Sequence, residues 1–312
     1  MEAAERLRAG GLVAFPTETV YGLGANALDP QAVARIFEAK ARPSFDPLIV
    51  HVPDLREAGR VASTSDPRVR SLAERFWPGP LTLVLPRRPE LPEIVTAGLP
   101  AVGVRVPGHS VARALLATAG VPVAAPSANP FGSVSPTTAE HVAQGLGDRV
   151  DLILDAGPCR VGVESTVLSL VDDPPVVLRP GGIPHEELEA ALGQTLEVRA
   201  SSSRPLSPGL LERHYATRTP LWLLDEAAPQ APPERGRVGL LAFEGAPRGH
   251  GYAAVEVLAP DGRLTTAAAN LFAALRRLDA LGLDLLIAEP VPDAGIGRAI
   301  LDRLRRAAAG SR

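Results

Sequence analysis

The chain has 312 residues, of which 46% are hydrophobic and 21% charged, a composition typical of a globular protein long enough for two domains. Its net charge of −3 excludes a surface that attracts nucleic acid as a whole, although not a local basic groove. It contains no run of about 18 apolar residues that could cross a membrane, and its N-terminal residues lack the apolar core of a signal peptide. We therefore expect a cytoplasmic protein with no membrane partner.

Short apolar runs alternate with amphipathic segments over the first two thirds of the chain. The expected strands are 11–15, 47–52, 81–85, 102–106, 121–125, 150–154, 165–170 and 175–178. The expected helices are 30–41, 67–76, 110–119, 137–145 and 184–192, and residues 1–10 have the pattern of a short surface helix. This mixture predicts an α/β fold.

The last third of the chain follows a break in the pattern at residues 199–209, a Ser- and Pro-rich stretch typical of a linker. Beyond it, the expected strands are 220–224, 238–243 and 284–288, and the expected helices are 264–281 and 296–309. Their order predicts a small parallel sheet. We divide the chain into a first domain at 1–200, a linker at 201–219 and a second domain at 220–312.

Residue types that bind metals are few and scattered. Cys159 is the single cysteine, which excludes an internal disulfide and a thiolate metal site and favours a buried, unreactive thiol. The six histidines form no pair at the spacing of a zinc site. The sequence therefore predicts no metal ligands.

Lysine is almost absent from this chain. Of the 32 basic residues, 31 are arginine and Lys40 is the one lysine. A lysine supplies a compact point charge where an arginine supplies a planar fork, so this exception favours a function over chance retention on a helix surface. Arg42 follows two residues later and Pro43 turns the chain, so both cations can converge on a polyphosphate. The alternative is favourable charge at a helix C-terminus.

Hydroxyl and glycine residues gather after the expected strands. The segment PTETVYGLG, residues 16–24, can hold a small polar ligand or form a tight turn that needs its glycines. The segment APSAN, residues 125–129, follows a strand where α/β sheets place ligands. Ser135 precedes a helix N-terminus, which is a natural anion site. His51 can donate to a carboxylate or be structural.

These segments together resemble a known family. The order PTETVYGLG, KARP, PLIVH, WPGPLT, VGVRVP, APSAN, STV and LRPGG resembles the Sua5/YrdC/YciO family over about residues 5–200. Its signature is a Lys-x-Arg and a Ser-x-Asn pair, here Lys40/Arg42 and Ser127/Asn129. The segment SPGLLERHYA at 207–216 and the residues after it resemble the Sua5 branch.

The resemblance implies a fold and an activity. The fold is a YrdC-like twisted mixed sheet with helices around a concave cavity, a linker lying over the active site, and a smaller Rossmann-like α/β domain. The activity is formation of threonylcarbamoyl-AMP and diphosphate from L-threonine, bicarbonate or CO2, and ATP with Mg2+, for the t6A modification of tRNA. The implied partners are these substrates, tRNA and the machinery that transfers the t6A group.

The resemblance also implies the site residues. Lys40 and Arg42 are the expected catalytic residues. L-threonine is expected to contact Thr19, His51, Arg105, the backbone of Ala125 and Ser165. ATP is expected to contact Arg42, Asp46, Ala101, Ser127, Asn129, Ser135, Arg179 and His214.

Several positions depart from the family pattern. Asp46 stands where asparagine is usual, and its carboxylate would repel phosphate unless it binds Mg2+ or points elsewhere. Ala101 replaces a common hydroxyl residue, so only its backbone can contact a ligand. The linker also differs at Leu211, Glu212 and Thr217 but keeps His214.

Two other functions are compatible with parts of the sequence. A non-catalytic protein that binds double-stranded RNA or tRNA would suit a basic cavity, but the net charge of −3 and the aromatic content of 4% argue against it. Related carbamoyl-adenylate chemistry in hydrogenase maturation proteins is accompanied by zinc fingers, which the single Cys159 excludes.

Overall fold

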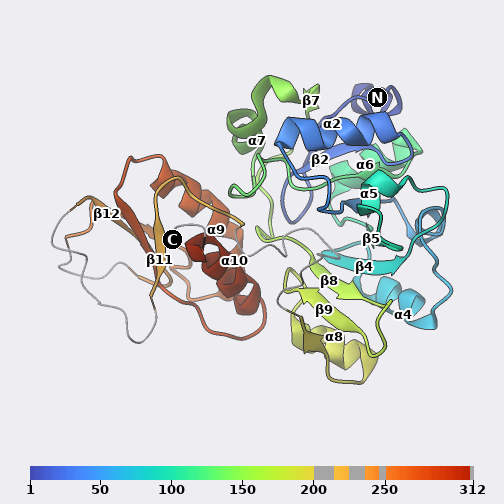
Figure 1. The fold of residues 1–312 in the computed structure, drawn as a ribbon. Coiled ribbons are helices and arrows are strands. Elements are labelled where there is room, and N and C mark those ends of the chain that lie inside the picture. Colours follow the sequence, from blue (N-terminus) through green and yellow to red (C-terminus); the bar gives the residue numbers. More distant parts are fainter. Residues whose placement is uncertain (200–213, 225–235, 246–250, 310–312) are drawn as a thin grey trace.

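The chain folds into two α/β units. The computed structural model describes residues 1–199, 214–224, 236–245 and 251–309 (Figure 1). The expected linker at 201–219 lies outside the described residues up to residue 213. Within the described part, no helix is long and apolar enough to pass through a membrane.

The larger unit is built on one mixed sheet of ten strands in the order β10-β9-β8-β4-β5-β3-β6-β2-β1-β7. The strands are β1 Val13–Phe15, β2 Gly22–Asn26, β3 Ile49–His51, β4 Leu81–Pro86, β5 Ala101–Arg105, β6 Val123–Ala124, β7 Leu152–Ile153, β8 Thr166–Ser169, β9 Val176–Arg179 and β10 Glu197–Val198. The helices are α1 Glu2–Arg8, α2 Pro30–Lys40, α3 Leu55–Ala58, α4 Pro67–Phe76, α5 Glu93–Thr96, α6 Ser110–Ala119, α7 Ala139–Leu146, the 3-10 helix Gly147–Arg149 and α8 His185–Leu192.

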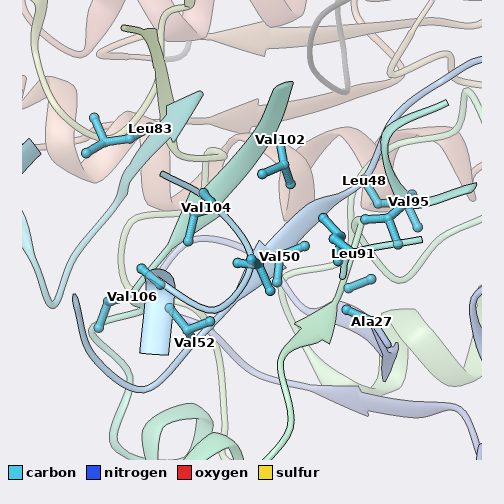
Figure 2. Close-up of a cluster of buried hydrophobic side chains, with 14 of the residues drawn as sticks. Ala27, Leu48, Val50, Val52, Leu83, Leu91, Val95, Val102, Val104 and Val106 are labelled. Atoms are coloured by element: carbon cyan, nitrogen blue, oxygen red, sulfur yellow. The ribbon is translucent and has the colours of Figure 1, made fainter. Parts of the chain in front are cut away.

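The main core lies on one face of this sheet. Val50 of β3 and Val104 of β5 are fully buried and join the aliphatic cluster shown in Figure 2. Side chains alternate between the two faces of a strand, so the residues that follow them, His51 and Arg105, point to the opposite face. The alternation therefore separates the core from the face that carries polar side chains.

β2 is a central strand that the sequence pattern did not predict. Its segment GLGAN pairs with β1 on one side and β6 on the other. A Cβ atom at Gly24 would lie 2.8 Å from carbon atoms of both Phe15 and Val123. Glycine is therefore needed here for the close packing of strands, whereas the sequence had suggested a ligand loop or a tight turn.

The smaller unit carries the second sheet, which is parallel and has the order β11-β14-β12-β13. Its elements are β11 Leu221–Leu223, β12 Val238–Ala242, β13 Ala254–Val257, β14 Leu285–Ala288, α9 Leu264–Asp279 and α10 Gly297–Ala309. The prediction of an α/β protein with a small parallel sheet is confirmed. β10 and β13 were not predicted, because β10 has only two residues, both exposed, and β13 is a four-residue strand that contains the charged Glu256.

The first helix differs from its prediction. α1 was expected on the surface, but Ala3, Ala4 and Leu7 are buried and pack with Leu116 of α6. Alanine contributes little to an amphipathic pattern although it packs closely, so the buried stripe was not visible in the sequence.

Candidate functional site

The polar face of the large sheet borders a cavity. Most of its walls come from the larger unit, and His214 and Tyr215 of the interdomain segment complete them. The lining residues are Thr17, Thr19, Val20, Gly22, Arg42, Ile49, His51, Arg105, Ala125, Pro126, Ser127, Glu164, Ser165, Arg179, His214 and Tyr215. Most of these residues are polar or charged, which suits a small polar ligand.

Strand register brings together the side chains expected to bind threonine. β3 and β5 run parallel, with His51 directly opposite Arg105. Ala125 follows β6, and its backbone N–H donates to the carbonyl of Ile49 at 2.9 Å. Thr19 and Ser165 reach the same cavity from loops. All five residues of the predicted threonine set therefore line one cavity.

Arg105 is the cation of this part of the cavity. Its Nη1 donates to Thr19 Oγ1 at 2.9 Å, its Nη2 to Glu18 Oε1 at 2.5 Å, and its Nε to the carbonyl of Gly79 at 3.2 Å. Burial alone would raise the pKa of Glu18, but Arg105 outweighs it and the pKa is lowered. A guanidinium has five N–H groups, so two remain for a ligand carboxylate.

His51 and Ser165 complete the threonine side. Burial, with a smaller contribution from Arg105, lowers the pKa of His51 to about 3, so its imidazole is neutral at pH 7. Its Nδ1 is buried and has no hydrogen-bond partner among the residues that the structure describes. Ser165 Oγ lies 2.8 Å from Thr82 Oγ1 and accepts from Arg179 Nη2 at 3.2 Å. This part of the cavity can donate to a carboxylate and accept from an amine or hydroxyl.

Arg42 and Arg179 line the other part of the cavity. The Nε and Nη2 of Arg179 donate to the carbonyl of Ser165 at 3.2 and 3.0 Å. Arg42 Nη2 lies 2.8 Å from Asp46 Oδ2. The guanidinium carbon of Arg42 lies 5.8 Å from the centre of the Phe131 ring. Two buried guanidinium groups at one cavity are suited to phosphate.

Asp46 is fully buried but does not line the cavity. Within the described part of the chain, neither of its carboxylate oxygens accepts a hydrogen bond, so its contact with Arg42 is an ion pair that lacks hydrogen-bond geometry. Burial raises the pKa of Asp46, and Arg42 opposes this effect. In the structure this carboxylate therefore neutralises Arg42 from outside the cavity lining.

Lys40 lies beneath the cavity wall. α2 ends there because Ala41 adopts a left-handed conformation, with φ of 50°. The ammonium Nζ is buried and donates to the carbonyls of Ser127 and Asn129, both at 2.5 Å. The turn at Ala41 therefore separates the two cations that were expected to converge, because Arg42 reaches the cavity and Lys40 holds the loop behind Ser127.

Several residues of the predicted ATP set do not line the cavity. These residues are Asp46, Ala101, Asn129 and Ser135. Lys40, which was expected to be catalytic, does not line the cavity either. Ala101 packs in an apolar cluster with Val84 and Val167, away from the polar face. Asn129 Nδ2 donates to the carbonyls of Pro130 and Ser133 within its own loop. Arg42, Ser127, Arg179 and His214 do line it, and the contacts of the whole set with ATP stay predictions.

Glu164 is a cavity residue that the sequence analysis did not single out. Ser135 Oγ donates to its Oε1 at 2.6 Å, and Arg303 Nε donates to its Oε2 at 3.0 Å. Burial would raise its pKa, but Arg303 and Arg179 outweigh burial and lower it to about 2. The sequence feature that could have identified it is a charged residue between Val163 and Ser165, in a segment of uncharged residues.

The segment from His214 to Ala216 closes the cavity. Burial lowers the pKa of His214 to about 3, and its ring lies edge-on to Phe131 and Tyr215. Ala216 N donates to the carbonyl of Gly132 at 2.7 Å.

In the part of the chain that the structure describes, no cluster of three or more His, Cys, Asp or Glu side chains could hold a metal ion.

Comparisons with known proteins agree with this geometry. Residues 5–181 match the Sua5–YciO–YrdC family model, described as telomere recombination, and residues 183–309 match the model described as threonylcarbamoyl-AMP synthase, C-terminal domain. The chain is 46% identical to the threonylcarbamoyl-AMP synthase of Bacillus subtilis, over 99% of this chain and 92% of the relative. It is 43% identical to that of Pyrococcus abyssi, over 98% and 92%.

Solved structures extend this similarity to the whole fold. The crystal structure of Pyrococcus abyssi Sua5 complexed with L-threonine has a TM-score of 0.91 and 40% identity, covering 99% of this chain and 94% of that one. Escherichia coli YciO has a TM-score of 0.52 and 30% identity, over 58% of this chain and 87% of its own. With both family models matched along its length, the chain belongs to the Sua5–YciO–YrdC family and to its Sua5 branch.

Proposed function

We propose that this protein is a threonylcarbamoyl-AMP synthase, which converts L-threonine, bicarbonate and ATP into threonylcarbamoyl-AMP, diphosphate and water. The observation that carries the proposal is one cavity lined by Arg105, whose guanidinium can bind a carboxylate, and by Arg42 and Arg179, whose guanidinium groups can bind phosphate. Relatives that match nearly the whole chain bear this enzyme's name.

Threonine would occupy the Arg105 half. The two remaining N–H groups of Arg105 would bind its carboxylate, and the neutral His51 and Ser165 would contact its polar groups. A neutral imidazole avoids repelling an ammonium group before it loses its proton. The Sua5 structure complexed with L-threonine supports this assignment.

The reaction needs no protein nucleophile. The neutral amine of threonine combines with CO2 to give an N-carboxylate and a proton, or with bicarbonate to give the same N-carboxylate and water. A carboxylate oxygen then bonds to the α-phosphorus of ATP, and the bond from that phosphorus to the bridging oxygen of diphosphate breaks. Positioning and cations that stabilise developing charge dominate such transfers. Arg42 and Arg179 would supply that charge, with Lys40 holding the loop of Ser127 in place.

Mg2+ would enter with the nucleotide. Magnesium is commonly held by one or two carboxylates together with substrate phosphates and water. The buried carboxylates nearest the cationic half, Asp46 and Glu164, are each paired with an arginine. We therefore assign the ion chiefly to the phosphates of ATP.

The product would be consumed by a cytoplasmic enzyme that transfers the threonylcarbamoyl group to tRNA.

Release of diphosphate from ATP tests the proposal. We expect release that requires both L-threonine and bicarbonate, and a product with the mass of threonylcarbamoyl-AMP. Arg105→Met should raise the KM for threonine by about 100-fold, because a charge-assisted bidentate contact is lost. Arg113→Met, on the partly exposed side of α6, is the matched control.

The outcomes separate the proposal from the alternative. Diphosphate release that is independent of threonine would contradict the synthase. Salt-sensitive tRNA binding without turnover of ATP would favour the RNA-binding function instead.

A further inference from the structure

The smaller unit packs directly against the wall of the cavity. Figure 1 shows α9 and α10 on the side of the smaller unit that faces the larger one. A Cβ atom at Gly162 would lie 2.3 Å from the carbonyl oxygen of Ala268 on α9, so only glycine permits this approach. Val20, Val134 and Val163 of the larger unit are part of the core cluster of the smaller one. The two units therefore share an apolar interface next to the site.

Arg303 of α10 crosses this interface. Its side chain is fully buried, although arginine is almost never buried without a partner. Its Nε lies 3.0 Å from Glu164 Oε2, and its Nη1 donates to the carbonyl of Pro180 and to Asp302 Oδ2, both at 2.8 Å. A side chain of the smaller unit thus binds a cavity residue and the backbone next to Arg179.

The same guanidinium supports a second cavity residue. Its central carbon lies 5.4 Å from the ring centre of Tyr215, and that ring stacks on Phe272 of α9 with centres 5.4 Å apart. Tyr215 has φ of 63°, a left-handed conformation that is strained for a bulky residue. Packing by the smaller unit therefore holds Tyr215, and with it the adjacent His214.

The charge of Glu164 makes this contact important. The carboxylate is ionised, because the combined effect of Arg303, Arg179 and Ser135 outweighs burial and lowers its pKa to about 2. Without Arg303, a buried negative charge would remain in the wall of a cavity meant for phosphates. It would also attract Arg179, which lies in the same cavity. Breaking a buried ion pair on one side leaves an uncompensated charge.

We propose that Arg303 is a positioning residue for the nucleotide half of the site, where it neutralises Glu164 and seats Tyr215 and His214. This inference rests on the proposed function. It assigns a task to the smaller unit, which completes the ATP side of a cavity whose threonine side is built by the larger unit alone.

Steady-state kinetics with a double-mutant cycle tests the proposal. Arg303→Met should raise the KM for ATP by about tenfold or more and change that for L-threonine by less than about threefold. In the background of Glu164→Gln, the same Arg303→Met substitution should raise the KM for ATP by less than about threefold, because no charge is left unpaired. Arg277→Met is the matched control, since Arg277 of α9 pairs with Glu256 of β13 within the smaller unit.

The results that would overturn the proposal are distinct. An unchanged KM for ATP in Arg303→Met, or effects of Arg303→Met and Glu164→Gln that simply multiply, would overturn it. If Arg303→Met does not fold, Arg303→Lys keeps the charge, and an equal loss of affinity for ATP and threonine in that variant would indicate a structural role only. If the wild type releases no diphosphate, the proposed function fails. ATP binding measured by calorimetry then decides the inference, and equal affinities of wild type and Arg303→Met would refute it.

Discussion

Replacing Lys40 separates support of a loop from direct chemistry. Lys40→Met keeps the length of the side chain but removes the donor to the carbonyls of Ser127 and Asn129. Lys40→Arg keeps the charge but places a larger planar group at a side chain that is 1% exposed. Neither substitution changes the side chain of Arg42, which lines the cavity.

The magnitude follows from the two carbonyls. A buried acceptor left without a partner costs about 1–3 kcal/mol, so Lys40→Met would cost about 2–6 kcal/mol from this effect alone. Burial, together with repulsion from Arg42, lowers the pKa of Lys40 well below its usual range, so removing the ammonium recovers part of this cost. We therefore expect the free energy of unfolding to fall by about 2 kcal/mol. Overpacking in Lys40→Arg should cost about 1–3 kcal/mol.

The kinetic effect comes from movement of the Ser127 loop. A displacement of about 1 Å at a reacting group can cost about 100-fold in rate. We expect kcat/KM for ATP to fall by about that factor in both variants, while threonine affinity stays within about threefold. Urea unfolding and diphosphate release measure the two effects, with Glu38→Gln on the exposed side of the same helical turn as the control.

Full activity of either Lys40 variant would refute the reasoning. Equal losses of threonine and ATP affinity would also refute it, because the threonine set does not depend on this loop except through Ala125. Retention of loop geometry with loss of turnover would instead identify direct contact between the ammonium and the phosphates.

Two further predictions concern charge. Asp46→Asn should lower the KM for ATP by about threefold or more, because Arg42 is no longer neutralised. The same substitution should reduce thermal stability. A higher Mg2+ requirement of this variant would show instead that Asp46 binds the metal. His51 and His214 have folded-state pKa values of about 3, below the ordinary 6.5. As pH falls, these histidines therefore bind protons in the unfolded chain before they do so in the folded protein. The folding stability that their neutral state contributes above pH 6.5 is lost as pH falls below 6.5. Each histidine should cost about 2 kcal/mol between pH 6.5 and 5, and a His214→Gln variant should show a correspondingly smaller slope in urea unfolding.

Local patterns were sufficient for elements with their own start and stop signals. α4 was predicted at 67–76 and is observed there, because Asp66 caps it, Pro67 suits its first turn and Val69, Leu72 and Phe76 share a face. β2 was missed because its glycines signal a turn, and only its neighbours Phe15 and Val123 reveal that they make room for strands. Hydrophobic periodicity reports on burial along one element, whereas strand packing is decided by partners far away in sequence.

The chain's sequence alone determined which residue types follow which strands, and its resemblance to the family implied the threonine set. Arg105, His51 and Ala125 lie on or next to paired strands, so alternation along those strands aims them into one cavity. Only the tertiary structure decided that Lys40 turns under the Ser127 loop, that Ala101 packs in an apolar cluster, and that Arg303 reaches Glu164 from 139 residues away. Side-chain direction at a helix end depends on the turn that follows it, and a contact between units depends on how they dock; neither leaves a local pattern in the sequence.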